Sequence, residues 1–191
     1  MNQPTPTERL LLRPVTLEDG PFILELLTSK SWLDNIGNRS VYTLDDARKY
    51  ISDQLLPAYG TPACGPMLCV LKSDGTIIGN TGVYSRPGLD TPDFGFAFLE
   101  EYHGKGYARE ASVANLAYAV AHGHSELLAI TLPTNQPSLS LLEKLGFARE
   151  PGLIRLPGDP KDLVLLRWSY GREAVPQGTL IGSKEIGRAH V

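Results

Sequence analysis

The stretch Tyr102-His103-Gly104-Lys105-Gly106-Tyr107-Ala108-Arg109 decides the fold, because it forms a glycine-rich turn between a strand and a helix. Before it, the segment 93–99 carries phenylalanines at alternate positions, which predicts a strand with one aromatic face. After it, the alanine-rich run 108–122 predicts a helix. Backbone N–H groups at a helix N-terminus, together with the helix dipole, suit a phosphate or a pyrophosphate.

The residue types within the turn favour the same chemistry. Gly104 and Gly106 let the backbone come close to an anion, and Lys105 and Arg109 add positive charge at the rim. The turn is not a Walker A loop, because no Gly-Lys-Ser/Thr follows a four-residue gap. It is not a clean dinucleotide fingerprint either, because Arg109 occupies the third glycine position. Taken alone, a Gly-Lys-Gly turn is often only a turn.

The rest of the chain alternates strands and helices around this turn. In chain order we expect a strand at 10–12 that stops at Pro14, a helix at 17–27, a loop at 29–41, a helix from Thr43 to Pro57, strands at 67–71 and 76–83, the strand and helix around the turn, a strand at 127–132, a helix at 136–145, and a hairpin of 147–156 with 163–170. The order β-α-α-β-β-β-α-β-α-β-β predicts a mixed α/β sandwich rather than a doubly wound sheet.

Composition indicates one soluble globular domain in the 191 residues, with 42% apolar and 20% charged residues. The net charge of -3 gives no general reason to bind nucleic acid or an anionic membrane. The two cysteines lack zinc-ligand spacing, so we expect no metal. We expect a cytoplasmic protein, because cysteine is rare, the N-terminus lacks a signal-peptide pattern and no apolar run could span a bilayer.

The C-terminal stretch differs from the rest of the chain. We expect a domain at 7–170 and a flexible tail at 171–191, because that stretch is polar and without period. One back-translation of residues 185–191 matches a common sequencing-adapter sequence, which suggests an assembly artefact. Recovering the same codons from the source DNA with adapter-free reads would refute that interpretation.

A second motif lies downstream of the turn. It begins with Asn135-Gln136-Pro137-Ser138 and ends with Leu145-Gly146-Phe147 after a helix. With both motifs in this order, the segment from about Thr7 to Tyr170 resembles the GNAT superfamily of CoA-dependent N-acetyltransferases, most closely its RimJ/RimL-type branch. The opening Glu8-Arg9-Leu10-Leu11-Leu12-Arg13-Pro14 also resembles that branch. The turn departs from the broader family at His103, where that family prefers Gln or Arg.

The resemblance implies a fold and a reaction. The fold would be an α/β GNAT fold, with a central, mostly antiparallel sheet, a splayed cofactor cleft and flanking helices. The reaction would be direct attack of a primary amine on the thioester of acetyl-CoA, with no metal and no covalent enzyme intermediate. The enzyme would be a monomer or a homodimer. The negative net charge favours a cationic acceptor, and the branch suggests a protein N-terminal α-amine.

The resemblance also assigns residues to acetyl-CoA. Phe96, Ala97 and Phe98 would hold the pantetheine arm like an added strand, and backbone N–H groups there would form an oxyanion hole. Residues His103, Gly104, Lys105, Gly106, Tyr107, Ala108 and Arg109 would hold the pyrophosphate. Asn135 would hydrogen-bond to the pantetheine arm; it also fits as a helix N-cap, and both roles are compatible.

Two residues are candidates for catalysis. Asp93 could be the general base, acting through one water, or alternatively an anchor for the substrate ammonium or a solvated strand-end carboxylate. Ser138 could donate a hydrogen bond to the leaving thiolate and contact CoA, or be an ordinary first-turn residue. Many relatives carry a tyrosine general acid four residues later, where this chain has Leu142.

Other functions remain open at this point. The protein could be a CoA-binding regulatory module without catalysis, or an acetyltransferase for a small amine or an antibiotic. It could also be a nucleotide-phosphate binder that uses the glycine-rich turn for ATP or NAD.

Overall fold

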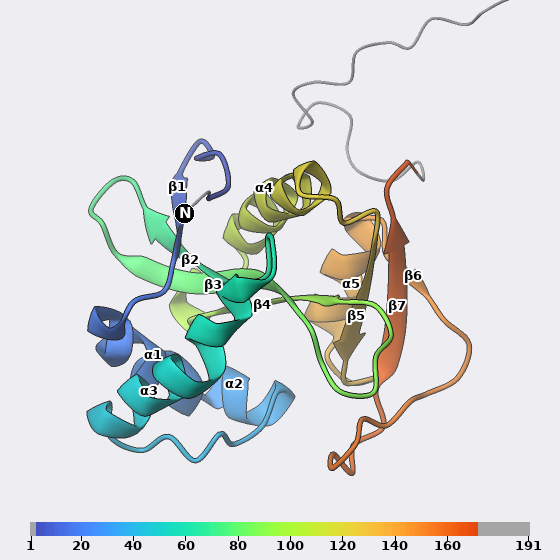
Figure 1. Cartoon of the computed structure of the whole chain (residues 1–191), viewed down its shortest axis with the longest axis horizontal. Helices are drawn as coiled ribbons and strands as arrows, with labels where there is room; N and C mark the ends of the chain where they lie inside the picture. The colour runs from blue at the N-terminus through green and yellow to red at the C-terminus, as the bar shows by residue number, and fades with distance from the viewer. Residues whose placement is uncertain (1–2, 172–191) are drawn as a thin grey trace, which may run out of the picture.

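The structure, a computed structural model, describes residues 3–171. Its centre is a seven-stranded sheet in the order β1-β2-β3-β4-β5-β7-β6 (Figure 1). The strands are β1 (Leu10–Pro14), β2 (Gly65–Leu71), β3 (Ile77–Tyr84), β4 (Asp93–Phe98), β5 (Glu126–Thr131), β6 (Ala148–Arg149) and β7 (Val164–Ser169). The α-helices are α1 (Gly20–Thr28), α2 (Lys30–Asn35), α3 (Leu44–Tyr50), α4 (Tyr107–Ala121) and α5 (Gln136–Lys144).

The sheet consists of two antiparallel halves joined at one point. β1 to β4 form an antiparallel meander, and β5 pairs antiparallel with β7. Between the halves, β4 and β5 run parallel, and their register contains only the pair Asp93 and Leu128. The N–H of Leu128 donates to the carbonyl of Pro92 at 2.9 Å. The two strands separate beyond this pair, which confirms the predicted mixed sheet with a splay.

Helices cover both faces of the sheet (Figure 1). Phe94, Phe96 and Phe98 pack on the face that carries α4 and α5, as their alternation predicts. Ala97 packs on the opposite face, in the cluster formed with α1 and α3. The alternating residues of β4 therefore join both layers of the core, which fixes the strand that leads into the glycine-rich turn.

Two predicted boundaries are wrong in the segment 29–60. The expected loop at 29–41 contains α2, whose N-cap Ser29 accepts a hydrogen bond from the amide of Trp32 at 3.3 Å. The second helix does not end at Pro57. It passes into a π-helical turn (Ile51–Leu55) and then a 3-10 turn (Leu56–Gly60), because proline is tolerated in the first turn of a new helical segment.

The last hairpin is present but shorter than predicted. β6 has only two residues; after it the Glu150 amide donates to Leu165 of β7 at 2.8 Å, and an isolated bridge joins Ile154 to Leu163, just before β7. The expected tail beyond Gly171, with its segment 185–191, lies outside the described residues. Within 3–171, no helix combines the length and the apolar character needed to cross a membrane.

Candidate functional site

The glycine-rich turn presents a row of free backbone donors at the start of α4. Gly104 and Gly106 both adopt left-handed conformations, with φ of 71° and 82°, and Gly106 is the N-cap of the helix. Such angles favour glycine strongly. No amide N–H of residues 104–109 donates a hydrogen bond to any described residue. Consecutive unpartnered amides at a helix N-terminus form an anion-binding nest, which fits a pyrophosphate.

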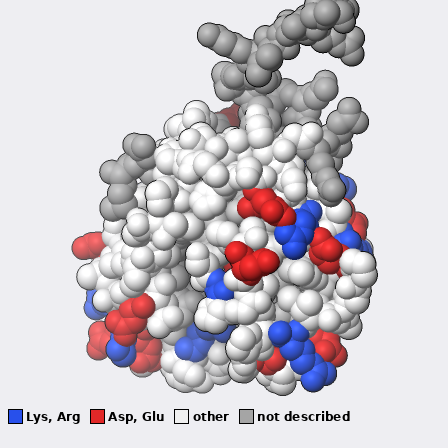
Figure 2. All heavy atoms as spheres, turned by 45° about the vertical axis from the view of Figure 1, so that its right-hand side comes forward, with Lys and Arg blue, Asp and Glu red and all other residues white. Residues whose placement is uncertain are grey.

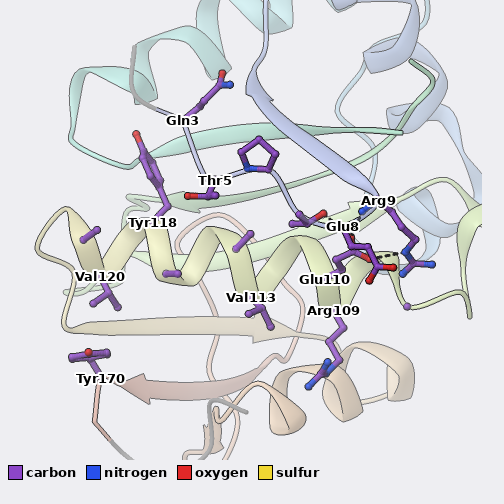
Figure 3. A pocket seen from close by; sticks show the side chains of 16 residues that line it. Gln3, Thr5, Glu8, Arg9, Arg109, Glu110, Val113, Tyr118, Val120 and Tyr170 are labelled. Carbon is purple, nitrogen blue, oxygen red and sulfur yellow. Dashed lines mark hydrogen bonds and ion pairs between the residues drawn. The ribbon is translucent and has the colours of Figure 1, made fainter. Parts of the chain in front are cut away.

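The turn is tied to the first strand through Glu110. Its carboxylate accepts hydrogen bonds from the Thr7 hydroxyl at 2.6 Å, the Arg9 amide at 2.8 Å and the Arg9 Nε at 2.7 Å (Figure 3). Burial alone would raise the pKa of Glu110, but these bonds outweigh it and hold the pKa below its ordinary value. The carboxylate therefore remains charged and fixes the segment before β1 against α4.

Arg9 extends this tie to the turn itself. Its Nη1 donates to the carbonyl of Lys105 at 3.0 Å, and its guanidinium carbon lies 4.2 Å from the centroid of the Tyr107 ring. The resemblance placed Arg9 only in a first strand, and neither Arg9 nor Glu110 was predicted at the site. Glu110 directly follows the predicted phosphate-binding residues, but no sequence pattern showed that it would meet a residue about 100 positions earlier.

The charged and aromatic residues of the turn differ in their surroundings. The ring of His103 lies with Nε2 at 2.8 Å from the carbonyl of Phe98, so Nε2 donates to it and ties the turn to the end of β4. The Lys105 ammonium lies 5.5 Å from the centroid of the Tyr102 ring. Arg109 points away from the Arg9–Glu110 pair, across the helix (Figure 3), and makes no ion pair with a described residue.

The edge of β4 that faces the splay has free backbone groups. The Leu99 amide donates to Ile78, so odd-numbered residues of β4 bond to β3 and even-numbered residues face away from it. Phe96 therefore directs its N–H and C=O toward the gap beside β5, while Ala97 bonds toward β3. Phe98 shares the orientation of Phe96, although its carbonyl is already used by His103. An extended ligand could pair with this edge as an added strand.

The second motif lies at the start of α5, after β5. Asn135 is the N-cap, and its side-chain oxygen accepts the Ser138 amide at 3.3 Å, which confirms the capping role. The side-chain nitrogen of Asn135 and the hydroxyl of Ser138 make no hydrogen bond with a described residue. Leu142 is buried in the core at 2% exposure and offers no acid.

Asp93 lies at the point where β4 and β5 separate. It is 1% exposed, and both carboxylate oxygens accept hydrogen bonds from the Nε of Arg86, at 2.7 and 2.8 Å. Burial raises the pKa of Asp93, and the charge of Arg86 only partly opposes this, so the pKa lies above its ordinary value. Asp93 was expected at the site from the sequence, but Arg86 was not, because its link to Asp93 depends on the loop between β3 and β4.

A cavity of about 790 Å³ runs along α4 rather than along the splay. The N-terminal segment from Gln3 to Arg9 forms one wall, and Tyr170 lies at the far end (Figure 3). Only Gly106 and Arg109 of the glycine-rich turn reach it. Neither Asp93 nor the free edge of β4 at Phe96 lines this groove; both lie at the splay.

One face of the molecule shows how its surface charges are distributed. Acidic and basic side chains are interspersed on the face that carries β7, rather than forming a field of one sign (Figure 2). Arg167, for example, pairs with both Glu126 and Glu150. Within residues 3–171, no group of three or more His, Cys, Asp or Glu side chains is placed to hold a metal ion.

The splayed sheet, the anion nest after β4 and the free edge of β4 together have the shape and donors that fit an acyl-CoA. The comparisons with known proteins identify the family. A family model described as an acetyltransferase (GNAT) domain matches residues 9–148, and the chain belongs to the GNAT acetyltransferases. It is thus an acyltransferase of a family that uses acetyl-CoA.

Individual relatives agree with this assignment. An uncharacterized N-acetyltransferase, YnaD of Bacillus subtilis (strain 168), is 28% identical over 145 residues, covering 75% of this chain and 82% of its own. The crystal structure of an acetyltransferase from Agrobacterium tumefaciens is 27% identical with a TM-score of 0.72, covering 88% of this chain and 95% of its own. RimL, a ribosomal L7/L12 α-N-protein acetyltransferase solved with coenzyme A, shares the fold with a TM-score of 0.73 at 18% identity, covering 88% and 98%.

Proposed function

We propose that this protein transfers an acetyl group from acetyl-CoA to a primary amine, by direct attack of the amine on the thioester. The observation that carries the proposal is the row of unpartnered amides at residues 104–109, beside the free edge of β4. These groups fit the pyrophosphate and the pantetheine arm of CoA. When bound, acetyl-CoA supplies the activated acetyl group. The residues of the chain bind it, stabilise the developing charge and move the protons.

Different residues around the splay bind different parts of acetyl-CoA. The amides of the glycine-rich turn, with Lys105 and Arg109, bind the pyrophosphate, and the backbone of Phe96 pairs with the pantetheine arm. The N–H groups of that strand edge stabilise the negative charge that develops on the thioester oxygen. Asn135 keeps its side-chain oxygen in the helix cap and offers its side-chain nitrogen to the pantetheine arm.

Asp93 serves as the general base in this proposal. A lysine amine titrates near about 10.4 and an α-amine near about 8, so a proton must be removed before attack at neutral pH. Because Asp93 is 1% exposed, the amine cannot touch it directly and the proton passes through one water. The raised pKa of the buried carboxylate makes it a stronger base than an exposed aspartate.

Ser138 is proposed as the donor to the leaving thiolate. Its hydroxyl has no partner among the described residues, and it lies in the first turn of α5, where the helix dipole favours negative charge. The acceptor class remains a proposal as well. The RimL structure, named as a protein α-amine acetyltransferase, favours a protein N-terminus, and a small amine is the alternative.

The test measures acetylation of an amine panel, with N-terminal peptides and small amines, by product mass and by release of the CoA thiol. We expect turnover by the native chain, a loss of about 100-fold or more in kcat for Asp93→Asn, and about tenfold for Ser138→Ala. Asp162→Asn, an exposed carboxylate paired with Arg155, is the control and should retain activity. Tight acetyl-CoA binding without turnover of any amine would instead support a CoA-binding regulatory module.

A further inference from the structure

A second cavity, of about 430 Å³, lies beside the Asp93–Arg86 pair, at the start of β4. Three segments that are distant in sequence line it, at 36–39, 86–87 and 156–161. The glycine-rich turn lies at the other end of β4. If acetyl-CoA binds as proposed, this cavity is on the side from which the amine arrives, and its role as an acceptor site rests on that proposed function. We call it the acceptor pocket.

The ammonium of Lys161, which lines the acceptor pocket, keeps N–H donors that no described residue accepts. Its Nζ donates to the carbonyl of Ile36 at 3.0 Å, and no carboxylate of a described residue lies within ion-pair distance of it. An ammonium has three donors, so others remain for a ligand. Gly37 makes room for this group, since a Cβ there would lie 2.8 Å from Nζ and its φ of +115° also favours glycine.

Arg86 also lines this pocket. Its Nε is used by Asp93, while the terminal nitrogens donate to no described residue. The side chain is 33% exposed, and its guanidinium carbon lies 5.5 Å from the centroid of the Tyr84 ring. Asp93 thus orients Arg86 from behind and leaves its paired N–H groups for a ligand, and such a fork matches a carboxylate or a phosphate.

Arg39 adds a further charge without a partner. It is exposed and makes no ion pair with any described residue. The lining of the acceptor pocket therefore holds three cations, Arg39, Arg86 and Lys161, against one carboxylate, Asp159, so its net charge is +2. The side chain of Asp159 is occupied by the Lys161 amide at 3.0 Å. Counting Asp93 behind the lining still leaves the site positive.

We infer that the acceptor carries an anionic group, a carboxylate, on the same molecule as the amine that is acetylated. The local charge opposes the expectation of a cationic acceptor that the net charge of -3 suggested, and a pocket's own charges govern what binds in it. The volume suits a small molecule or the first few residues of a peptide. Arg39, Lys161 and the outer nitrogens of Arg86 set this specificity.

The test compares acceptors that differ only in charge. One arm pairs free amino acids with their carboxamides, and the other pairs N-terminal peptides that carry Asp or Glu with the same peptides carrying Asn or Gln. We expect kcat/KM to be about tenfold higher for the anionic member, mainly through KM. Whichever arm shows the difference identifies the source of the anion. The preference should weaken as salt is raised.

Matched variants assign the preference to the pocket. Lys161→Gln and Arg39→Gln should each reduce the anionic-to-neutral ratio of kcat/KM by several-fold. Arg155→Gln is the control, because Arg155 lies in the same connection before β7, pairs with Asp162 and does not line the pocket. Unfolding midpoints confirm that each variant is folded.

The outcomes separate this inference from the proposed function. The inference is overturned if the native chain acetylates both acceptors with an anionic-to-neutral kcat/KM ratio near one. It is also overturned if that ratio is equally large in Lys161→Gln and Arg39→Gln. Either result leaves the proposed acetyltransferase function intact. Acetyl-CoA binding without acetylation of any anionic acceptor also overturns the inference. Absence of both acetyl-CoA binding and acetylation removes the proposed function and the inference together.

Discussion

Replacing Glu110 with Gln tests whether the first strand holds the glycine-rich turn in its binding shape. The carboxylate accepts three hydrogen bonds at 2.6–2.8 Å, two of them from Arg9. A Gln side chain has the same shape but no charge, and its amide NH2 group would face the N–H and O–H donors of Arg9 and Thr7. Charge-assisted bonds contribute about 1.5–3 kcal/mol, and Arg9 is 40% exposed, so solvent screening lowers the expected loss to about 1–2 kcal/mol.

The assay has two readouts, thermal unfolding and titration with acetyl-CoA. For a domain of this size the stability loss corresponds to a midpoint lower by roughly 2–8 °C. We also expect about tenfold weaker acetyl-CoA binding, because Arg9 positions the Lys105 carbonyl of the turn. Glu143→Gln, in the exposed pair with Arg149, is the control and should change stability by less than about 0.5 kcal/mol. Native affinity for acetyl-CoA in Glu110→Gln would refute the reasoning about the turn.

Other predictions concern stability. Ser112→Ala should raise the free energy of unfolding by up to about 1 kcal/mol in urea, since its buried hydroxyl has no hydrogen-bond partner in the described structure, and a clear loss would contradict this. Leu142→Ala should lower it by about 2–5 kcal/mol, and a change under 1 kcal/mol would show that the core is not packed there. Burial alone would raise the pKa of Asp19, but hydrogen bonds from Arg13 and Thr16 outweigh it and hold the pKa below its ordinary value, as for Glu110. The stabilisation that Asp19 and Glu110 provide is therefore complete above about pH 4–5, and it is lost as pH falls through their lowered pKa values. Measuring the unfolding midpoint as a function of acid pH checks this.

The parts of the fold that local sequence dictates were predicted well. The turn at Gly104 and Gly106 was predicted because left-handed glycines between a period-2 strand and a helix are a local signal. The start of α5 was predicted for the same reason, since an Asn cap is followed by Pro137. α2 was missed although Ser29 caps it, because none of its residues is buried and it shows no apolar period.

Each candidate site residue named from the sequence comes from a local motif in one segment. Asp93, Asn135 and the turn belong to local motifs, but their partners come from elsewhere in the chain. Arg9 meets Glu110, and Lys161 meets Ile36, across separations of 101 and 125 residues. No local pattern encodes such a meeting, because it follows from the order of strands in the sheet. The charge of the acceptor pocket could not be inferred from the net charge for the same reason.

The measurement that tests the central claim most directly is thermal unfolding with acetyl-CoA, CoA, ATP and NAD in parallel, for the native chain and for Gly106→Val. A ligand that binds only the folded state raises the midpoint, by about 2.7 kcal/mol of stability at a hundredfold excess over Kd. We predict a shift with acetyl-CoA and CoA alone, which is lost in Gly106→Val relative to that variant's own ligand-free midpoint. The absence of a shift with either CoA species, or equal shifts with ATP and NAD, would contradict the account.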